Sequence, residues 1–289
     1  MSIFCFSGQT LYSALLLGVS MASQQQARAF QRKVFSYYTK HKRPLPWRKT
    51  TNPYHILLSE IMLQQTQVER VIHYYGKWLR KWPTVGRLAK ASRVNVLKAW
   101  LGLGYNNRAK NLHQTAKIIS EKYKGDVLKA MEHYKELPGI GPYTAAAVQI
   151  FAANRGIATV DTNIRRILLH EFALSEKISD KKLWALAEKC LPKGKSREWH
   201  NALMDYGATL MTARKTGIKP KTQQPKFEGS DRQIRAKIIR KIVGRKKASF
   251  DSLMRLADED APRLKKIIEK MVEERLLKKS GHVYALSER

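Results

Sequence analysis

The sequence predicts an all-α fold with a small C-terminal module that ends in a β-hairpin. Apolar residues recur at three- and four-residue spacing almost throughout residues 27–213, which is the period of an amphipathic helix. A clear strand pattern is confined to residues 283–285 and their neighbours. Of the 289 residues, 43% are hydrophobic, and they include six Trp and twelve Tyr. The chain can therefore build a core and is no disordered basic tail.

Several helices stand out within the predicted core of residues 27–213. Their apolar positions cover residues 56–62, 68–79, 94–101, 112–123, 144–151 and 183–191. Thr84 and Ser92 are suited to cap helices, because a hydroxyl accepts a hydrogen bond from a free backbone amide. The Gly-Leu-Gly run at 102–104 interrupts the helical pattern.

A linker and a basic module are expected after the core. Residues 214–230 are rich in Lys, Gln, Pro, Thr and Gly, which is typical of a linker, and the module takes up 231–289. Helical segments at 232–243, 250–256 and 262–274, followed by a hairpin around Ser280-Gly281, outline a winged helix. Its third helix offers cations to a DNA groove or backbone at Arg263, Lys265, Lys266 and Lys270. A small protein-docking domain with solvated lysines is the alternative.

The charge of the chain points to an acidic partner. Lys and Arg number 55 against 23 Asp and Glu, a formal net charge of +32. Such an excess repels itself, and nucleic acid is the simplest partner that balances it. A ribosome-associated or merely cationic protein is the alternative. Two cysteines, Cys5 and Cys190, make neither a disulfide framework nor a four-thiolate metal site, and they favour a reducing interior.

Residues 1–26 are expected to form a disordered or dispensable leader. They contain no charged side chain, so the basic start of a secretory signal is missing. The apolar run at 10–21 is too short to span a bilayer, although Ser20-Met21-Ala22 resembles a cleavage site and keeps export as an alternative. Met21 is an alternative start. We expect a cytoplasmic or nucleoid protein without a membrane partner.

A hairpin motif at residues 136–145 is the most informative feature of the chain. Pro138 fixes φ at the entry to the turn, while Gly139 and Gly141 permit left-handed angles and a close approach of a ligand. Thr144 then opens a helix whose first amides are unpaired and electropositive. This arrangement can hold a phosphate without reading sequence.

A carboxylate follows the hairpin at Asp161, within Val160-Asp161-Thr162-Asn163. The residue lies at the start of a predicted helix, so it is suited to cap that helix. Beside a bound nucleotide it would instead face a developing sugar cation, as in paired-carboxylate glycosidases. Hairpin and carboxylate together suggest an enzyme that grips DNA phosphate and acts on the neighbouring sugar–base bond.

Residues 30–213 resemble the helix-hairpin-helix (HhH-GPD) base-excision DNA glycosylases, a two-lobed helical fold. The similarity is closest to the adenine-specific mismatch glycosylases and their thymine/uracil mismatch relatives. The motifs occur in family order at Leu45-Pro46-Trp47-Arg48, Asn52-Pro53-Tyr54, Ser59 to Val68, Gly102-Leu103-Gly104-Tyr105, the hairpin, Val160 to Asn163, and Asn201 to Ala208.

Glu60 is the predicted general acid. It lies in an otherwise apolar helical segment, where loss of hydration is expected to raise its pKa. Adenine leaves more easily once a ring nitrogen is protonated, and the resemblance assigns this proton transfer to Glu60. A carboxylate on the helix surface is the alternative. The resemblance also implies that Asp161 stabilises the sugar cation and that Asn163 bonds within the same site.

Tyr143 predicts a monofunctional enzyme. Bifunctional relatives carry a Lys there and form a Schiff base, which a phenol cannot do. Tyr143 is instead expected to assist at the sugar, and an ordinary packed tyrosine is the alternative. The resemblance places Gln64, Gln65 and Thr66 in the segment that wedges into the duplex when the base is extruded. It also places Trp47 and Arg48 around the extruded base, whereas core packing is the alternative for Trp47. Arg108 is expected to make a generic phosphate contact.

Three departures from the family bear on cofactor and substrate. The cysteine spacing of the family's iron–sulfur cluster falls on Met211, Ile218, Lys221 and Phe227, so no such cluster is expected, and packing must hold that lobe. After Tyr105, adenine glycosylases usually have a second Tyr, whereas Asn106 stands here as in the thymine/uracil relatives. The usual oxidised-guanine recognition domain is replaced by the module. An alkali cation on hairpin carbonyls is a further implication of the resemblance.

The sequence thus predicts a monomeric, monofunctional glycosylase that removes adenine opposite 8-oxoguanine or guanine from double-stranded DNA with mismatched or oxidised base pairs. Removal of thymine or uracil opposite guanine is the alternative reaction. A catalytically silent DNA-binding protein is the alternative of another class, against which the joint presence of the predicted catalytic residues argues.

Overall fold

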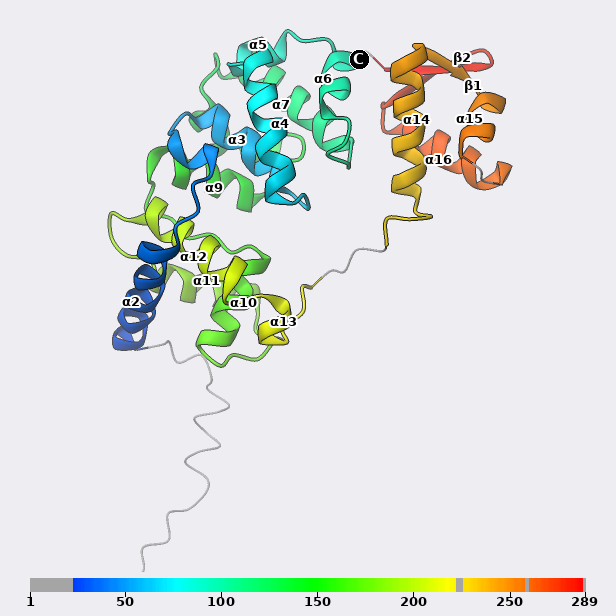
Figure 1. Ribbon diagram of the computed structural model, residues 1–289. Helices are drawn as coiled ribbons and strands as arrows, with labels where there is room; N and C mark the ends of the chain where they lie inside the picture. The colour runs from blue at the N-terminus through cyan, green and yellow to red at the C-terminus, as the bar shows by residue number, and fades with distance from the viewer. Residues whose placement is uncertain (1–22, 222–225, 258–259, 288–289) are drawn as a thin grey trace, which may run out of the picture. The chain divides into compact units, whose positions relative to one another are not determined.

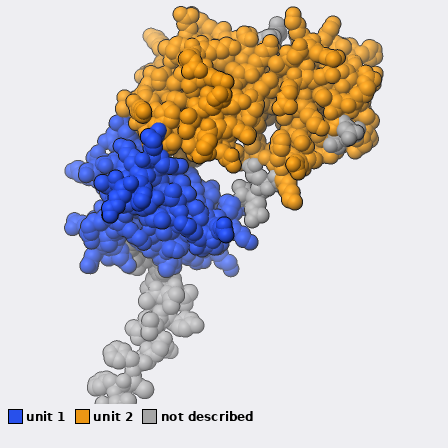
Figure 2. Space-filling model, in the orientation of Figure 1, with its two compact units in different colours: residues 1–44, 154–222 blue, residues 45–153, 223–289 orange. Residues whose placement is uncertain are grey.

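The computed structural model describes residues 23–221, 226–257 and 260–287. Helices make up nearly all of its regular structure, which confirms the predicted class (Figure 1). The chain divides into unit 1, residues 1–44 and 154–222, and unit 2, residues 45–153 and 223–289 (Figure 2). Within the described residues, every helix is too short or too polar to cross a lipid bilayer.

Unit 1 is a helical assembly built from both ends of the predicted core. Its helices are α2 (Gln24–His41), α10 (Thr162–Glu171), α11 (Asp180–Lys189), α12 (Ser196–Thr209) and the short α13 (Ala213–Thr216). Helix α12 packs against α2 and α10. The ring of Phe30 meets the ring of Trp199 edge to face with centroids 5.4 Å apart. One apolar core therefore joins elements from distant parts of the sequence.

Helix α2 begins earlier than the predicted leader ends. The Ser23 hydroxyl accepts from the Gln26 amide at 3.1 Å, and the Gln26 side chain accepts from the Ser23 amide at 2.7 Å. This reciprocal capping box fixes the first turn, so residues 24–26 are helical and the predicted leader is too long by these three residues. Residues 1–22, with Cys5 and Met21, lie outside the described residues.

Unit 2 begins with a helical part that surrounds the apolar helix α3. The elements are η1 (Pro46–Lys49), α3 (Pro53–Leu63), α4 (Val68–Lys81), α5 (Val85–Ala89), α6 (Arg93–Trp100), α7 (Asn107–Lys122), α8 (Val127–Glu132), η2 (Tyr134–Glu136) and α9 (Pro142–Ala153). Helix α3 packs against α4, α7 and α9. The predicted caps are confirmed, because Thr84 accepts from the Arg87 amide and Ser92 from the Asn95 amide.

The C-terminal part of unit 2 is a winged helix, as the sequence predicts. Its elements are α14 (Asp231–Arg245), β1 (Lys247–Ser249), α15 (Phe250–Ala257), α16 (Ala261–Glu273), β2 (Leu277–Ser280) and β3 (Val283–Leu286). The antiparallel sheet has the order β1-β3-β2. Sequence reasoning missed β1, because three residues are too few to show an alternating pattern.

Candidate active site

Glu60 lies near the end of helix α3 as a half-buried carboxylate among buried neighbours. Ile56 to Ser59 precede it and Ile61 and Met62 follow it, and all six are buried. Asn52 starts the helix by accepting the Tyr54 and His55 amides. Helix α3 also packs on α9, which carries the half-buried Tyr143. Unit 2 therefore places the predicted acid and the diagnostic tyrosine on adjacent helices.

The hairpin has the predicted turn. Gly139 has φ +77°, and a Cβ there would lie 2.9 Å from Asn111 Nδ2, so the position requires glycine. Gly141 has no left-handed φ, and a Cβ there would meet no atom within 4 Å. Of the two glycines that permit a left-handed angle, only Gly139 adopts one, while the open surroundings of Gly141 leave room for a ligand. Buried Thr144 follows in the first turn of α9, as predicted.

Two loops with left-handed residues lie beside each other in unit 2. Gln65, in the exposed turn after α3, has φ +56°, and Tyr105, before α7, has φ +47°. Such angles cost a non-glycine residue about 1 kcal/mol or more, so surrounding contacts must hold them. Thr66 Oγ1 lies 3.4 Å from the Leu103 carbonyl and links the two loops directly.

Arg108 holds both loops from the inside. Its Nη1 donates to the carbonyls of Ile61, Met62 and Gln64 at 2.9, 3.0 and 2.6 Å. Its Nη2 donates to Thr66 Oγ1 and to the carbonyls of Leu103 and Gly104 at 3.1, 2.9 and 3.1 Å. Desolvation by burial lowers the pKa of its guanidinium to about 10.

The structure thus corrects the role expected for Arg108. A phosphate contact would need free donors, but both terminal nitrogens already bind backbone or hydroxyl oxygens of the protein. The guanidinium also lies over the ring of Trp100, 5.1 Å from its centroid. Arg108 is therefore a positioning residue for the turn that carries Gln65.

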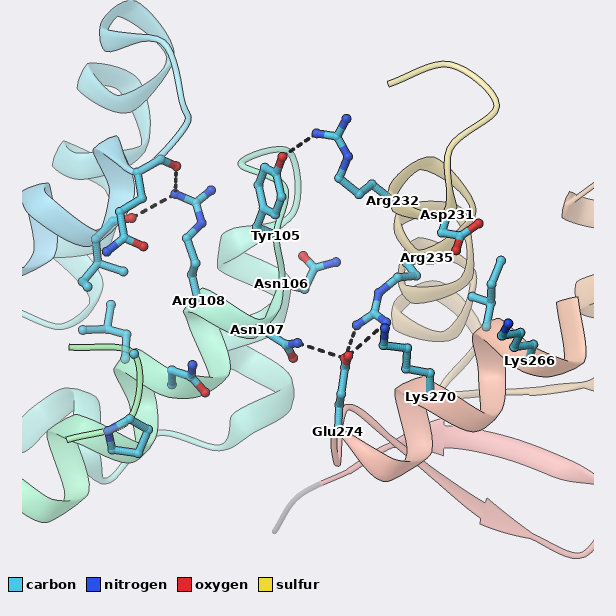
Figure 3. A pocket seen from close by; sticks show the side chains of 17 residues that line it. Tyr105, Asn106, Asn107, Arg108, Asp231, Arg232, Arg235, Lys266, Lys270 and Glu274 are labelled. Atoms are coloured by element: carbon cyan, nitrogen blue, oxygen red, sulfur yellow. Dashed lines mark hydrogen bonds and ion pairs between the residues drawn. The ribbon is translucent and has the colours of Figure 1, made fainter. Parts of the chain in front are cut away.

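A pocket of about 620 Å³ collects predicted residues from separate motifs of unit 2 (Figure 3). Gln64 comes from the wedge, Tyr105 and Asn106 from the glycine turn, and Gly139 from the hairpin. The sequence did not single out the other lining residues that matter here, which are Asn107, Asn111, Arg232, Arg235 and Glu274. For Arg232 and Arg235, the only signal in the sequence was the basic charge of the module.

Asp161 in unit 1 is the N-cap of α10, which was one of the two roles predicted for it. Its Oδ1 accepts from the Ile164 amide at 2.7 Å, and its Oδ2 accepts from Asn163 Nδ2 at 3.0 Å. Arg166 Nη2 in turn donates to Asn163 Oδ1 at 2.6 Å, and its Nε donates to the Met211 carbonyl at 2.5 Å. A chain of hydrogen bonds therefore orients the Asp161 carboxylate.

Burial dominates the ionisation of Asp161. Desolvation raises the pKa of its carboxyl, against the Ile164 amide, the Asn163 bonds and the nearby charge of Arg166, which all lower it. Sequence reasoning missed Arg166, although its spacing of three from Asn163 places both on one face of a helix.

The remaining predicted residues lie in or beside the helical core of unit 2. Trp47 is buried in η1 and meets Tyr75 edge to face with centroids 5.6 Å apart, so it has the core packing that was its alternative. Arg48 is half-buried in the same turn.

The segment on which the expected cysteine spacing falls is held by packing and by an ion pair. Met211 and Ile218 are partly buried against the core of unit 1, which confirms the packing expected for Met211. Lys221 pairs with Asp180 at 2.5 Å. Burial raises the pKa of the Cys190 thiol to about 12, so it is a poor ligand and nucleophile. In the part of the chain that the structure describes, no group of three or more His, Cys, Asp or Glu could hold a metal ion.

Known proteins are similar to this chain in both sequence and fold. Residues 58–193 match the family model of the HhH-GPD superfamily base excision DNA repair proteins. The adenine DNA glycosylase of Mycolicibacterium smegmatis is 36% identical over 227 residues, which cover 71% of this chain and 78% of the relative. The human adenine DNA glycosylase is also 36% identical, but only 37% of its length is covered.

Solved structures agree with this relationship. A thermostable thymine-DNA glycosylase has a TM-score of 0.63 at 32% identity, with 69% of this chain and 92% of that one covered. An endonuclease III in a non-covalent DNA complex has a TM-score of 0.59 at 20% identity and supports the fold alone. The chain therefore belongs to the HhH-GPD superfamily of base-excision DNA glycosylases, and within it to the adenine DNA glycosylases.

Proposed function

We propose that this protein is a monofunctional glycosylase that hydrolyses the N-glycosidic bond of adenine opposite 8-oxoguanine or guanine in duplex DNA. The observation that carries the proposal is the half-buried carboxyl of Glu60 in helix α3, where the flanking residues 56–59, 61 and 62 are buried. The relatives that are named adenine DNA glycosylases support the choice of base.

In the proposed reaction, Glu60 donates a proton to a ring nitrogen of the extruded adenine. The bond between C1′ and the base then breaks, and its electron pair goes to the protonated base, which leaves neutral. The Asp161 carboxylate, oriented by Asn163, stabilises the positive charge on the sugar. Water adds to C1′ and releases a proton, so the product is an abasic site.

Further residues have proposed roles in binding. The exposed, left-handed Gln65 is proposed to enter the gap in the duplex, supported by Gln64 and Thr66. The hairpin, with its tight Gly139, the open surroundings of Gly141 and Thr144 in the first turn of α9, is proposed to hold a phosphate. Tyr143 replaces the amine of a lyase, and Trp47 and Arg48 shape the base pocket.

Cofactor, assembly and location stay predictions. No iron–sulfur chemistry is assigned, because the four positions of the family spacing offer no thiolate. The carbonyl oxygens of Leu137 and Pro138 already accept hydrogen bonds, from the Ile140 amide and the Thr115 hydroxyl respectively. An alkali cation bound to these hairpin carbonyls would share the oxygens with those donors. A monomer located with the cell's DNA is the prediction for assembly and location.

Removal of thymine or uracil opposite guanine is the second candidate reaction. Asn106 is the specific observation in its favour, because the thymine/uracil relatives tend to carry Asn there and the residue lines the pocket beside Tyr105. The similarity to a thymine-DNA glycosylase structure adds support.

One assay separates the candidates. The protein is incubated with duplexes that contain A·8-oxoG, A·G, T·G or U·G and is then treated with alkali. Cleavage only after alkali, and only at adenine-containing duplexes, is expected. Cleavage confined to T·G and U·G would establish the second reaction, and none with any duplex would leave a silent DNA-binding protein. Nicking without alkali, together with borohydride trapping, would refute the monofunctional role of Tyr143.

The role of Glu60 is tested by Glu60→Gln, with Glu69→Gln on the exposed face of α4 as the matched control. The amide cannot donate the acid proton, so adenine release should be abolished while duplex binding is kept. The control should behave like the wild type. Full activity of Glu60→Gln would exclude this residue as the general acid.

A further inference from the structure

The pocket of Figure 3 has one wall from the helical core and one from the winged-helix module. Tyr105, Asn106 and Asn107 face it from the core. Arg232 and Arg235 of α14 and Lys266 and Lys270 of α16 face it from the module. Five of its lining residues are cationic and two, Asp231 and Glu274, are acidic, so the pocket has an excess of positive charge.

The module is held against the core at the end of α16. Glu274 Oε2 accepts from Asn107 Nδ2 at 2.9 Å and also pairs with Arg235. Lys110 Nζ donates to the Glu274 carbonyl at 2.6 Å, where the negative end of the helix favours a cation. The guanidinium of Arg232 donates to the Tyr105 hydroxyl at 2.5 Å (Figure 3). These bonds fix α16 so that two of its lysines line the pocket.

The four cations expected on α16 differ in what they do. Arg263 is occupied within the module, because its Nη2 lies 3.0 Å from Asp231 Oδ1 and donates to the Gly229 carbonyl. Lys265 is exposed but does not line the pocket. Lys266 and Lys270 are exposed and line it, and neither has an ion-pair partner among the described residues. Their charge is therefore available to an anion in the pocket.

We propose that this pocket binds the phosphate backbone of duplex DNA, with Lys266 and Lys270 as the contacts that the module supplies. The same pocket is lined by Gln64 of the wedge and Gly139 of the hairpin, so a duplex held by these elements passes the two lysines. Flexible ammonium groups suit phosphate and carry no base-specific pattern. The module thus adds affinity without adding choice of base. This inference rests on duplex DNA being the substrate of the proposed function.

The test is equilibrium binding of the full chain to an undamaged fluorescent duplex, measured by anisotropy over a range of salt concentrations. The variant Lys266→Ala/Lys270→Ala is compared with Lys247→Ala/Lys278→Ala, which removes two exposed lysines of the same module that do not line the pocket. Each lost phosphate contact removes about 0.9 from the slope of log K against log salt, so the pocket variant should lose about two. The control should keep the slope of the wild type.

Three results would overturn the proposal. An unchanged slope in the pocket variant would show that the lysines do not touch DNA. Tighter binding of that variant would show that the two lysines hinder the duplex instead of contacting it. An equal loss of slope in both variants would show that only the total charge of the module matters, and not the position of the lysines in the pocket. Excision at A·8-oxoG is measured on the same proteins and tests the proposed function. The salt slopes are measured on undamaged DNA, which a glycosylase does not cleave, so they test the pocket independently of catalysis.

Discussion

Replacing Arg108 by lysine tests whether one guanidinium holds the two loops of the candidate site. Arginine reaches the carbonyls after α3 with Nη1 and the glycine turn with Nη2, six acceptors in all. A lysine ammonium is a single point with three donors, so it can serve one loop but not both. The variant keeps the charge and loses the bridge.

The expected cost follows from the bonds that are lost. Three of the six acceptors lose their donor, at about 1 kcal/mol each, which gives a destabilisation of about 3 kcal/mol. For a chain of this size, that lowers Tm by roughly 5–10 °C. Gln65 and Tyr105 would then no longer be held at their left-handed angles, so adenine excision under single-turnover conditions should slow as well.

Thermal unfolding followed by circular dichroism gives Tm, and hydrogen exchange of the amides at 64–66 and 102–105 reports on the loops themselves. Arg70→Lys is the matched control, because exposed Arg70 donates one bond, at 3.4 Å, to the Gly102 carbonyl of the same turn. If Arg108→Lys melts and exchanges like this control and excises adenine at the wild-type rate, Arg108 does not position the wedge.

Three further predictions concern single groups. Burial, with Lys117 and Arg93 nearby, lowers the pKa of His113 to about 4, so the unfolded state binds more protons than the native state between pH 6.5 and 4. The free energy of unfolding, measured by urea titration, should therefore fall by up to about 3 kcal/mol as the pH is lowered over that range. The fall should be smaller in His113→Gln. Arg166→Gln removes a charge that lowers the pKa of Asp161, so the acid limb of the pH–rate profile should move to higher pH, with partial rescue by Arg166→Lys; an unmoved limb would mean that Arg166 is only structural. The thiol of Cys190 should resist iodoacetamide in the native protein and react after unfolding, and rapid native labelling would contradict its burial.

Local patterns in the sequence were enough for the fold class and for much of the candidate site. The caps at Thr84 and Ser92 and the left-handed turn at Gly139 are set by residues that are close in the sequence, so the sequence predicts them. The winged helix followed from three helical periods and a turn, whereas β1 was too short to leave a signal. Gly141 does not take a left-handed angle, and two glycines in a motif do not indicate which of them will.

The sequence by itself determined which residues have the chemistry: an acid in an apolar helix, a carboxylate before α10, and a tyrosine where a lyase has its amine. Only the tertiary structure decided what each cation does. Arg108 and Arg166 are turned inward to oxygens of the protein, Arg263 pairs within the module, and Lys266 and Lys270 line a pocket. These side chains carry the same charge, and their partners come from residues far away in the chain or from the backbone, so neither composition nor spacing distinguishes them.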